Sequence, residues 1–152
     1  MFILLHVLFG AFIGKEVNSV LILLVLALIC HFVMDMIPHW DGFFDKNKFE
    51  STREIDIIRK DIAVRAFDVV LAAAICIYLY FKMDSSLVIL GALFSAAPDL
   101  IKVFYFTKAR KIKTFDSYLR FHSKIQKGTK RVRTGLLIQA VCIIILIILI
   151  IK

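Results

Sequence analysis

The sequence is low in charged residues and in cysteine for its length. Only 21% of the 152 residues are charged, whereas 61% are hydrophobic; soluble domains usually contain about 45–50% apolar residues. The chain is therefore not an ordinary water-soluble domain, and its long apolar runs also exclude intrinsic disorder. The three cysteines lie inside these runs and are odd in number. This excludes a disulfide framework and a cysteine-based metal site.

The sequence does contain apolar runs of the length that membrane helices need. A helix requires about 20 apolar residues to cross a bilayer. The first run has neither the basic start nor the cleavage site of a signal peptide, so we keep it as a helix of the mature protein. The predicted fold is all-α, a single polytopic membrane helical bundle over residues 1–152. Its five hydrophobic helices, the first of them short, are expected over residues 2–14, 18–37, 61–82, 85–106 and 134–151.

Small residues and positive charge give further detail of this bundle. Gly10 and Gly14 share one face of the first helix, where we expect close packing against a neighbour. Residues 107–133 contain ten Lys or Arg and one acidic residue, so the positive-inside rule places them in the cytoplasm. Five crossings then put residues 38–60 on the same side. The predicted location is the inner (plasma) membrane, with several crossings and a cytoplasmic N-terminus.

The basic segment also predicts a partner. Apolar and aromatic residues alternate with Lys and Arg along residues 107–133, which is typical of an amphipathic helix lying on the anionic inner leaflet. Anionic membrane lipids are therefore the expected partners. Nucleic acid is the other common partner of such a patch, but we do not expect it here, because membrane topology already explains the charge.

Ionisable residues inside the predicted helices carry the functional information. Such residues cost free energy in a bilayer and usually mark a functional site. With a rise of about 1.5 Å per residue, all of them fall in the cytoplasmic half of the bilayer. We therefore expect one common site, to which the helices contribute His6, His31, Asp35, Asp68 and Asp99.

The segment HFVMDMIPHWD contains the densest group of these side chains. His31 and Asp35 are four residues apart, so both project from one helix face toward a shared cation. The helix then ends at a proline, and His39 and Asp41 follow at the interface. Imidazole and carboxylate are the ligands of zinc, manganese and non-haem iron, and more than four candidates favour two or more ions. We predict a divalent-metal site, with zinc as the first choice, formed by His6, His31, Asp35, His39, Asp68 and Asp99.

Several of these residues have an alternative explanation. His6 could be a packed histidine bonded to a backbone carbonyl. Asp68 and Asp99 each have a basic residue three positions away, Arg65 and Lys102, and could form ion pairs within their helices. The whole set could also be a structural polar network in the core of the bundle.

Three further polar residues are assigned supporting roles. Asp41 and His122 are the candidates for orienting a ligand or moving a proton. His122 could also be a further metal ligand or a group facing a phosphate, and the alternative is a solvated histidine on the interfacial helix. Gln139 is the only polar residue in the middle of the last apolar run, and we expect it to donate an interhelical hydrogen bond.

Three short motifs resemble those of the uncharacterised bacterial membrane-bound metal-dependent hydrolases. They are HVLFGAFIG (residues 6–14), HFVMDMIPHWD (31–41) and APDL (97–100), so the similarity lies between residues 6 and 100. A His-Arg-Gly-x-Thr-His-Ser element that is common in that group is absent, and only His122 could replace part of it. The resemblance implies a metal-dependent hydrolase but no particular substrate.

The predicted function is hydrolysis of a phosphoester or pyrophosphate of an amphiphilic, lipid-like substrate at the cytoplasmic interface. Metal ions lower the pKa of bound water and neutralise phosphate charge, while the basic segment attracts an anionic headgroup. The alternatives are a transporter of metal ions or protons and a non-enzymatic structural or assembly protein. A transporter needs polar groups that continue to the other face, and the outer halves of the predicted helices are almost entirely apolar.

Overall fold

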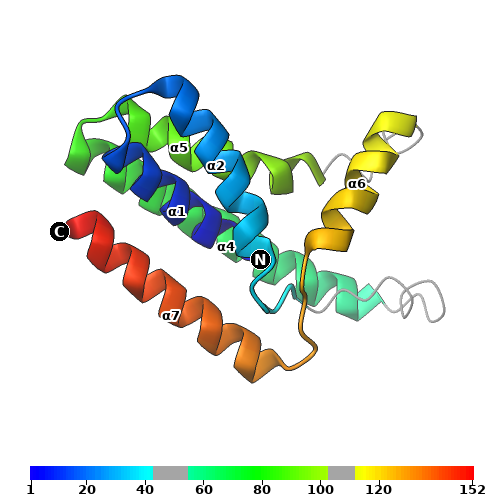
Figure 1. Cartoon of the computed structure of the whole chain (residues 1–152). Helices are drawn as coiled ribbons and strands as arrows, with labels where there is room; N and C mark the ends of the chain where they lie inside the picture. Colours follow the sequence, from blue (N-terminus) through cyan, green and yellow to red (C-terminus); the bar gives the residue numbers. More distant parts are fainter. Residues whose placement is uncertain (43–54, 103–111) are drawn as a thin grey trace.

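The described part of the chain consists of helices and the segments that connect them (Figure 1). The computed structural model describes residues 1–42, 55–102 and 112–152, without the side chains of residues 55–59. Within these ranges there is no strand, only an isolated parallel β-bridge between His39 and Gly128. The all-α prediction is thus confirmed for the described residues. The helices are α1 (Ile3–Glu16), α2 (Val20–Asp35), α4 (Ile55–Met83), α5 (Ser86–Ile101), α6 (Lys113–Ile125) and α7 (Val132–Ile151).

The helix boundaries follow local signals in the sequence. The helix α2 ends at Asp35, shortly before Pro38, because a proline disfavours helical backbone in the residue before it. A turn at Asp84, whose φ of 46° is left-handed, separates α4 from α5. The fourth predicted helix continued to residue 106, but residues 103–106 lie outside the described ranges, as do 43–54 of the expected 38–60 connection. The amphipathic helix α6 occupies part of the expected 107–133 segment.

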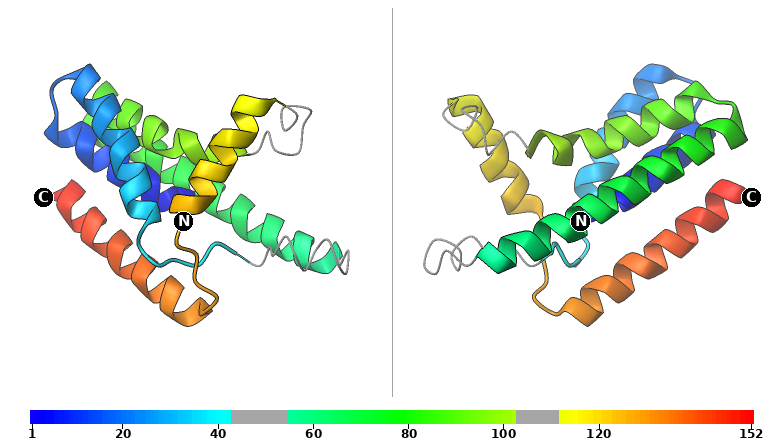
Figure 2. Two further views of the ribbon diagram at one scale, coloured as in Figure 1. Left: turned by 45° about the vertical axis from the view of Figure 1, so that its right-hand side comes forward. Right: turned by 180° about the vertical axis from the view of Figure 1, so that it is seen from behind.

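The first helix lies at the centre of the bundle. It packs most extensively against α5 and also contacts α4, α7 and α2 (Figure 2). The crossing with α5 is tight, because a Cβ atom on Gly10 would collide with the carbonyl oxygen of Gly91, and one on Gly14 with that of Leu87. The expected close packing at Gly10 and Gly14 is confirmed.

Among the described residues, two helices are long and apolar enough to cross a membrane. They are residues 60–83 of α4 and the whole of α7, with 24 and 20 residues. The apolar helices α2 and α5 have 16 residues each, or about 24 Å of helix, compared with a hydrocarbon core of about 30 Å. Five crossings are therefore not confirmed by helix length.

Four helix ends meet near the centre of the molecule. The start of α1 and the last turns of α2, α5 and α6 converge there (Figures 1 and 2). Backbone hydrogen bonds fasten the chain that follows α6 to the end of α2: the Lys127 amide donates to the Asp35 carbonyl at 2.9 Å, and the Thr129 amide to the His39 carbonyl at 2.7 Å. These bonds position α6 beside the ends of α2 and α5.

Candidate metal centre

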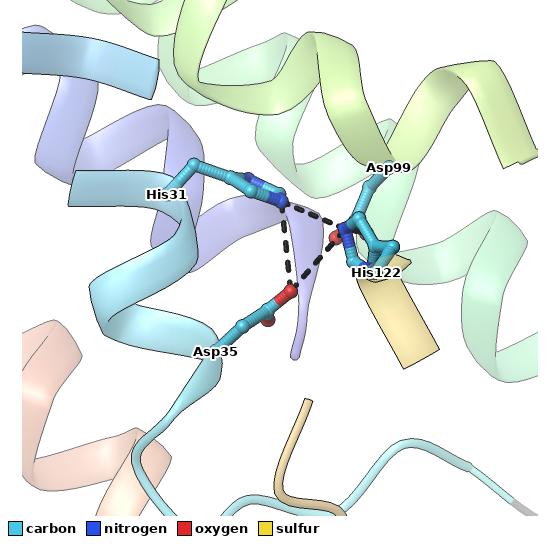
Figure 3. Close-up of side chains that lie close together, drawn as sticks. All are labelled: His31, Asp35, Asp99 and His122. Carbon is cyan, nitrogen blue, oxygen red and sulfur yellow. Dashed lines mark hydrogen bonds and ion pairs between the residues drawn. The ribbon is translucent and has the colours of Figure 1, made fainter. Parts of the chain in front are cut away.

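Four buried side chains form a compact group where the helix ends meet (Figure 3). His31 and Asp35 come from α2, Asp99 from α5 and His122 from α6. The side chains of His31 and Asp35 are fully buried, that of His122 is 1% exposed and that of Asp99 is 8% exposed. We call these residues the four-residue cluster. One ligand atom from each lies within 4.8 Å of the other three, which makes this a candidate metal site.

The distances inside the four-residue cluster suit one small cation. His31 Nε2 lies 3.0 Å from His122 Nε2 and 3.5 Å from Asp35 Oδ2. His122 Nε2 lies 3.4 Å from Asp35 Oδ2 and 3.5 Å from Asp99 Oδ1. A tetrahedral zinc ion with bonds of about 2.0–2.1 Å would separate its ligand atoms by about 3.3–3.4 Å. The measured separations therefore leave room for one tetrahedral ion among the four atoms.

The hydrogen bond on the far side of His31 fixes the form of its ring. Its Nδ1 lies 2.8 Å from the carbonyl oxygen of Ser95. A carbonyl oxygen only accepts, so Nδ1 must carry the proton, and in the neutral ring the lone pair is on Nε2, which faces the cluster. Metal-binding histidines usually donate their other N–H to such an acceptor. The Ser95 carbonyl thus holds the His31 ring in the orientation and tautomer that a metal-binding histidine needs.

His122 reaches the four-residue cluster because α6 turns one face toward it. Tyr118, His122 and Gln126 are spaced by four residues, and the Tyr118 hydroxyl donates to the Pro98 carbonyl at 2.7 Å. Beside them, the Phe121 ring packs edge-on against Phe32 of α2. Burial, and then the nearby Lys102 ammonium, lower the pKa of His122. The ring is therefore neutral at pH 7 and can offer a lone pair.

Two residues around Asp99 connect the cluster to the surface. Lys102 Nζ lies 2.7 Å from Asp99 Oδ1, which confirms the ion pair within α5 that was one of the explanations considered for Asp99. Lys102 also donates to Gln126 Oε1 at 3.2 Å, and Gln126 Nε2 donates to Asp41 Oδ2 at 2.7 Å. Asp99 is thus both a member of the cluster and an ion-pair partner.

His6 lies directly beside the four-residue cluster. Its Nε2 is 3.4 Å from Asp35 Oδ1 and 3.3 Å from Asp99 Oδ2, and its ring stacks on that of His31 with 4.1 Å between the centroids. The alternative of a histidine bonded to a backbone carbonyl does not fit, because neither ring nitrogen of His6 makes a hydrogen bond to a described residue.

His39 and Asp41 form a neighbouring pair outside the four-residue cluster. His39 Nε2 lies 2.8 Å from Asp41 Oδ1, and the other ring nitrogen of His39 donates to the Ile37 carbonyl at 2.7 Å. The Met1 nitrogen lies 2.6 Å from Asp41 Oδ1. Burial alone would raise the pKa of Asp41, but the His39 hydrogen bond and the Met1 charge outweigh it and hold that pKa well below its usual range. Asp41 is therefore ionised at pH 7.

Asp68 has a different role from the predicted one. Its carboxylate accepts the Ile3 amide at 2.6 Å and the Leu4 amide at 3.1 Å. These amides belong to the first turn of α1 and have no partner within the helix, so Asp68 caps α1 from α4. The alternative for Asp68, an ion pair with Arg65, is not formed among the described residues. Arg65 instead donates to Asp61, four residues earlier in α4, at 2.6 Å.

Gln139 behaves as expected of an interhelical donor. Its side-chain amide donates to the Trp40 carbonyl at 3.1 Å and accepts from the Phe2 amide at 3.1 Å. It thus joins α7 to the start of α1 and to the chain that follows α2.

Several groups of this site were not predicted from the sequence. Gln126, the Tyr118 hydroxyl and the Ser95 carbonyl all contact the residues around the four-residue cluster. The spacing of Tyr118, His122 and Gln126 could have indicated the first two, since positions four apart share a helix face. A backbone carbonyl such as that of Ser95 leaves no signal in the residue types.

Comparisons of this chain with protein families, with curated proteins and with solved structures find no match.

Proposed function

We propose that this protein is a membrane-embedded, metal-dependent hydrolase that cleaves a phosphoester or pyrophosphate of an amphiphilic, lipid-like substrate. The observation that carries the proposal is the spacing in the four-residue cluster, where His122 Nε2 lies 3.0–3.5 Å from a ligand atom of each other member and all four ligand atoms lie within 4.8 Å of one another. At such distances the lone pairs of buried imidazole nitrogens and carboxylate oxygens repel one another unless a proton or a cation lies between them. A divalent cation satisfies all four at once.

The donor types favour zinc. Two imidazole nitrogens and two carboxylate oxygens form a mixed set that suits zinc, with manganese or iron as alternatives. The resemblance of residues 6–100 to bacterial membrane-bound metal-dependent hydrolases supports a divalent metal at this site. As predicted from the number of candidate ligands, we propose two or more ions.

The bound ion would supply a water molecule of lowered pKa and charge neutralisation for the phosphate. The protein residues would bind and orient the substrate around it. Lys102, at the edge of the cluster, is 30% exposed and lies close enough to contact an anionic group. Asp41 is too weak a base for proton abstraction at neutral pH, because its pKa is lowered. Its role in this proposal is to orient His39 and Gln126.

A membrane location is supported by what lies on the outside of the bundle. Large apolar side chains are exposed on α4 and α7, with Phe67 at 69%, Phe81 at 78% and Leu137 at 66%, whereas the site residues are buried. Large apolar side chains that are exposed together on a surface mark a region that contacts lipid or a partner. We propose that the bundle lies in the inner membrane with its site toward the cytoplasm, where the exposed basic residues of α6 and the following turn contact anionic lipids: Lys113, Arg120, Lys124, Lys127 and Lys130.

Metal analysis of the detergent-purified chain tests the proposal. We expect zinc or manganese to copurify and to raise thermal stability, and His31→Ala and Asp35→Ala to lose both effects. Asp116→Asn is the matched control, because this exposed carboxylate of α6 pairs only with Arg120 among the described residues. If the wild-type protein neither contains nor binds metal, the hydrolase proposal is wrong and a structural polar network explains the cluster.

The substrate class needs a separate assay. The metal-loaded protein should release product from a phospholipid, a lysophospholipid or an isoprenyl phosphate, and His31→Ala should not. Metal binding without cleavage of any of these would contradict the substrate class and favour a transport role. Vesicles with the reconstituted protein would then show metal uptake.

A further inference from the structure

The two carboxylates of the four-residue cluster each have a second oxygen that points to another histidine. Asp35 presents Oδ2 to His31 and His122, and its Oδ1 lies 3.4 Å from His6 Nε2. Asp99 presents Oδ1 to His122, and its Oδ2 lies 3.3 Å from the same nitrogen of His6. Both aspartates thus lie between His6 and His122.

Asp35 and Asp99 are the ion-pair partners of His6 among the described residues. The His6 side chain is fully buried, and neither ring nitrogen has a hydrogen-bond partner there. Leaving a buried polar group unpartnered costs about 1–3 kcal/mol. The ring nitrogen lies 3.4 Å and 3.3 Å from the two oxygens, as ligand atoms of a tetrahedral ion with bonds of about 2.0–2.1 Å would lie, about 3.3–3.4 Å apart.

The stacking of two histidines gives a second, independent indication. The rings of His6 and His31 lie side by side, with centroids 4.1 Å apart and planes tilted by 32°. Two-metal hydrolytic sites hold their ions about 3.5–4 Å apart. Asp35 is placed to bridge two such ions, because its Oδ1 lies 3.4 Å from His6 Nε2 and its Oδ2 lies 3.5 Å from His31 Nε2.

We propose that His6 Nε2, Asp35 Oδ1 and Asp99 Oδ2 form a second metal position, so that both aspartates bridge two divalent ions. The inference rests on the proposed function and deepens it. The four-residue cluster supplies four protein ligands, which is the number found in closed structural sites. The second position has three, which is the number that catalytic sites use while they keep one place for water or substrate. Hydrolysis is therefore assigned to the His6 side.

This assignment also specifies the substrate. Two divalent ions and the Lys102 ammonium carry more positive charge than the carboxylates of Asp35 and Asp99 can balance. An anionic phosphoester oxygen bound at the open place reduces this excess, whereas a neutral ester or amide does not. The substrate class that fits the second position is thus a phosphate ester or anhydride.

Metal counting and spin coupling in the wild-type protein test the proposal. Metal-free protein is titrated with Mn²⁺, the bound ions are counted by elemental analysis, and the electron paramagnetic resonance spectrum is recorded. We expect two ions per chain with the spectrum of a coupled pair. One ion per chain, or two ions without coupling, would overturn the second position while the four-residue cluster stands. No bound ion would overturn the proposed function itself.

A substitution at His6 assigns the second ion. We expect His6→Ala and the polar variant His6→Asn to bind a single uncoupled Mn²⁺ ion. Asp116→Asn is again the matched control, because this exposed carboxylate of α6 pairs only with Arg120 among the described residues, and it should keep both ions. A coupled pair that persists in His6→Asn would overturn the assignment and indicate that His6 is only a buried neighbour of the two aspartates.

Discussion

Removing the His122 ring should abolish most of the stabilisation that zinc gives this protein. His122 is the one member of the four-residue cluster from α6, and its Nε2 lies within 3.0–3.5 Å of the ligand atoms of the other three residues. In His122→Ala, the cluster keeps His31, Asp35 and Asp99 but has an open place where the fourth ligand was.

The magnitude follows from the linkage between binding and stability. A ligand at 100 times its Kd stabilises the folded state by about 2.7 kcal/mol. Loss of a group that only supports a ligand weakens metal affinity about 10–100-fold, so loss of the ligand itself should cost at least the upper value. At the same zinc concentration, the variant would then keep about 0.4 kcal/mol of stabilisation. The zinc-dependent part of the stability should fall by about 2.3 kcal/mol.

Thermal unfolding in detergent, with zinc and with chelator, measures this difference. For a chain of this size, 1 kcal/mol corresponds to about 2–4 °C, so the zinc-dependent shift in Tm should shrink by at least about 5 °C. Comparing each variant with its own chelated form removes the cost of the cavity that alanine leaves. Tyr118→Phe, which loses the hydroxyl bonded to Pro98, should lower Tm in both conditions and keep the zinc shift. An unchanged zinc shift in His122→Ala would refute the metal centre as we describe it.

Three other predictions concern the cap, the helix crossing and pH. Asp68→Ala should lower the free energy of unfolding by about 1–2 kcal/mol through loss of the α1 cap and leave the number of bound metal ions unchanged; a lower metal count would restore Asp68 as a ligand. Gly10→Ala and Gly91→Ala each place a Cβ against backbone of the other helix and should each cost about 1–3 kcal/mol in denaturant titrations; wild-type stability in both would argue against the tight crossing. Because burial and Lys102 lower the pKa of His122, the unfolded metal-free chain binds more protons there than the folded one. The stability of the metal-free protein should therefore be highest above the unfolded histidine pKa of about 6.5 and should fall as the pH drops below that value. This fall should be shallower in His122→Ala.

The apolar runs and the α2 motif were enough to predict part of this architecture. The runs predicted the helices, because a helix satisfies the backbone hydrogen bonds of a long apolar segment within that segment. The spacing of His31 and Asp35 predicted that both face one cation, and the estimated depths predicted that His6 and Asp99 would join them. Five crossings are not confirmed by helix length, because α2 and α5 have 16 residues each.

The rest depended on tertiary contacts that residue types do not reveal. His122 lies 91 residues after His31, and it is brought there by backbone bonds between the turn after α6 and the end of α2. Asp68 caps α1 because α4 passes the first turn of α1. The residue pattern of α4 alone cannot show which helix lies beside it. Arg65 had two acidic neighbours and binds Asp61, since residues four apart in a helix come closest.

The contact between His31 and His122 gives the metal site a mechanical consequence. An ion held by both rings would act as a cross-link that closes a loop of 91 residues, and it would restrict the unfolded chain as a disulfide does, by about 4–5 kcal/mol of chain entropy for a loop of that length. The three cysteines provide no such link, since all are free. The availability of metal would then decide how firmly the C-terminal third of this protein is held to its first two helices, and chelation should open α6 to proteases before the rest of the bundle.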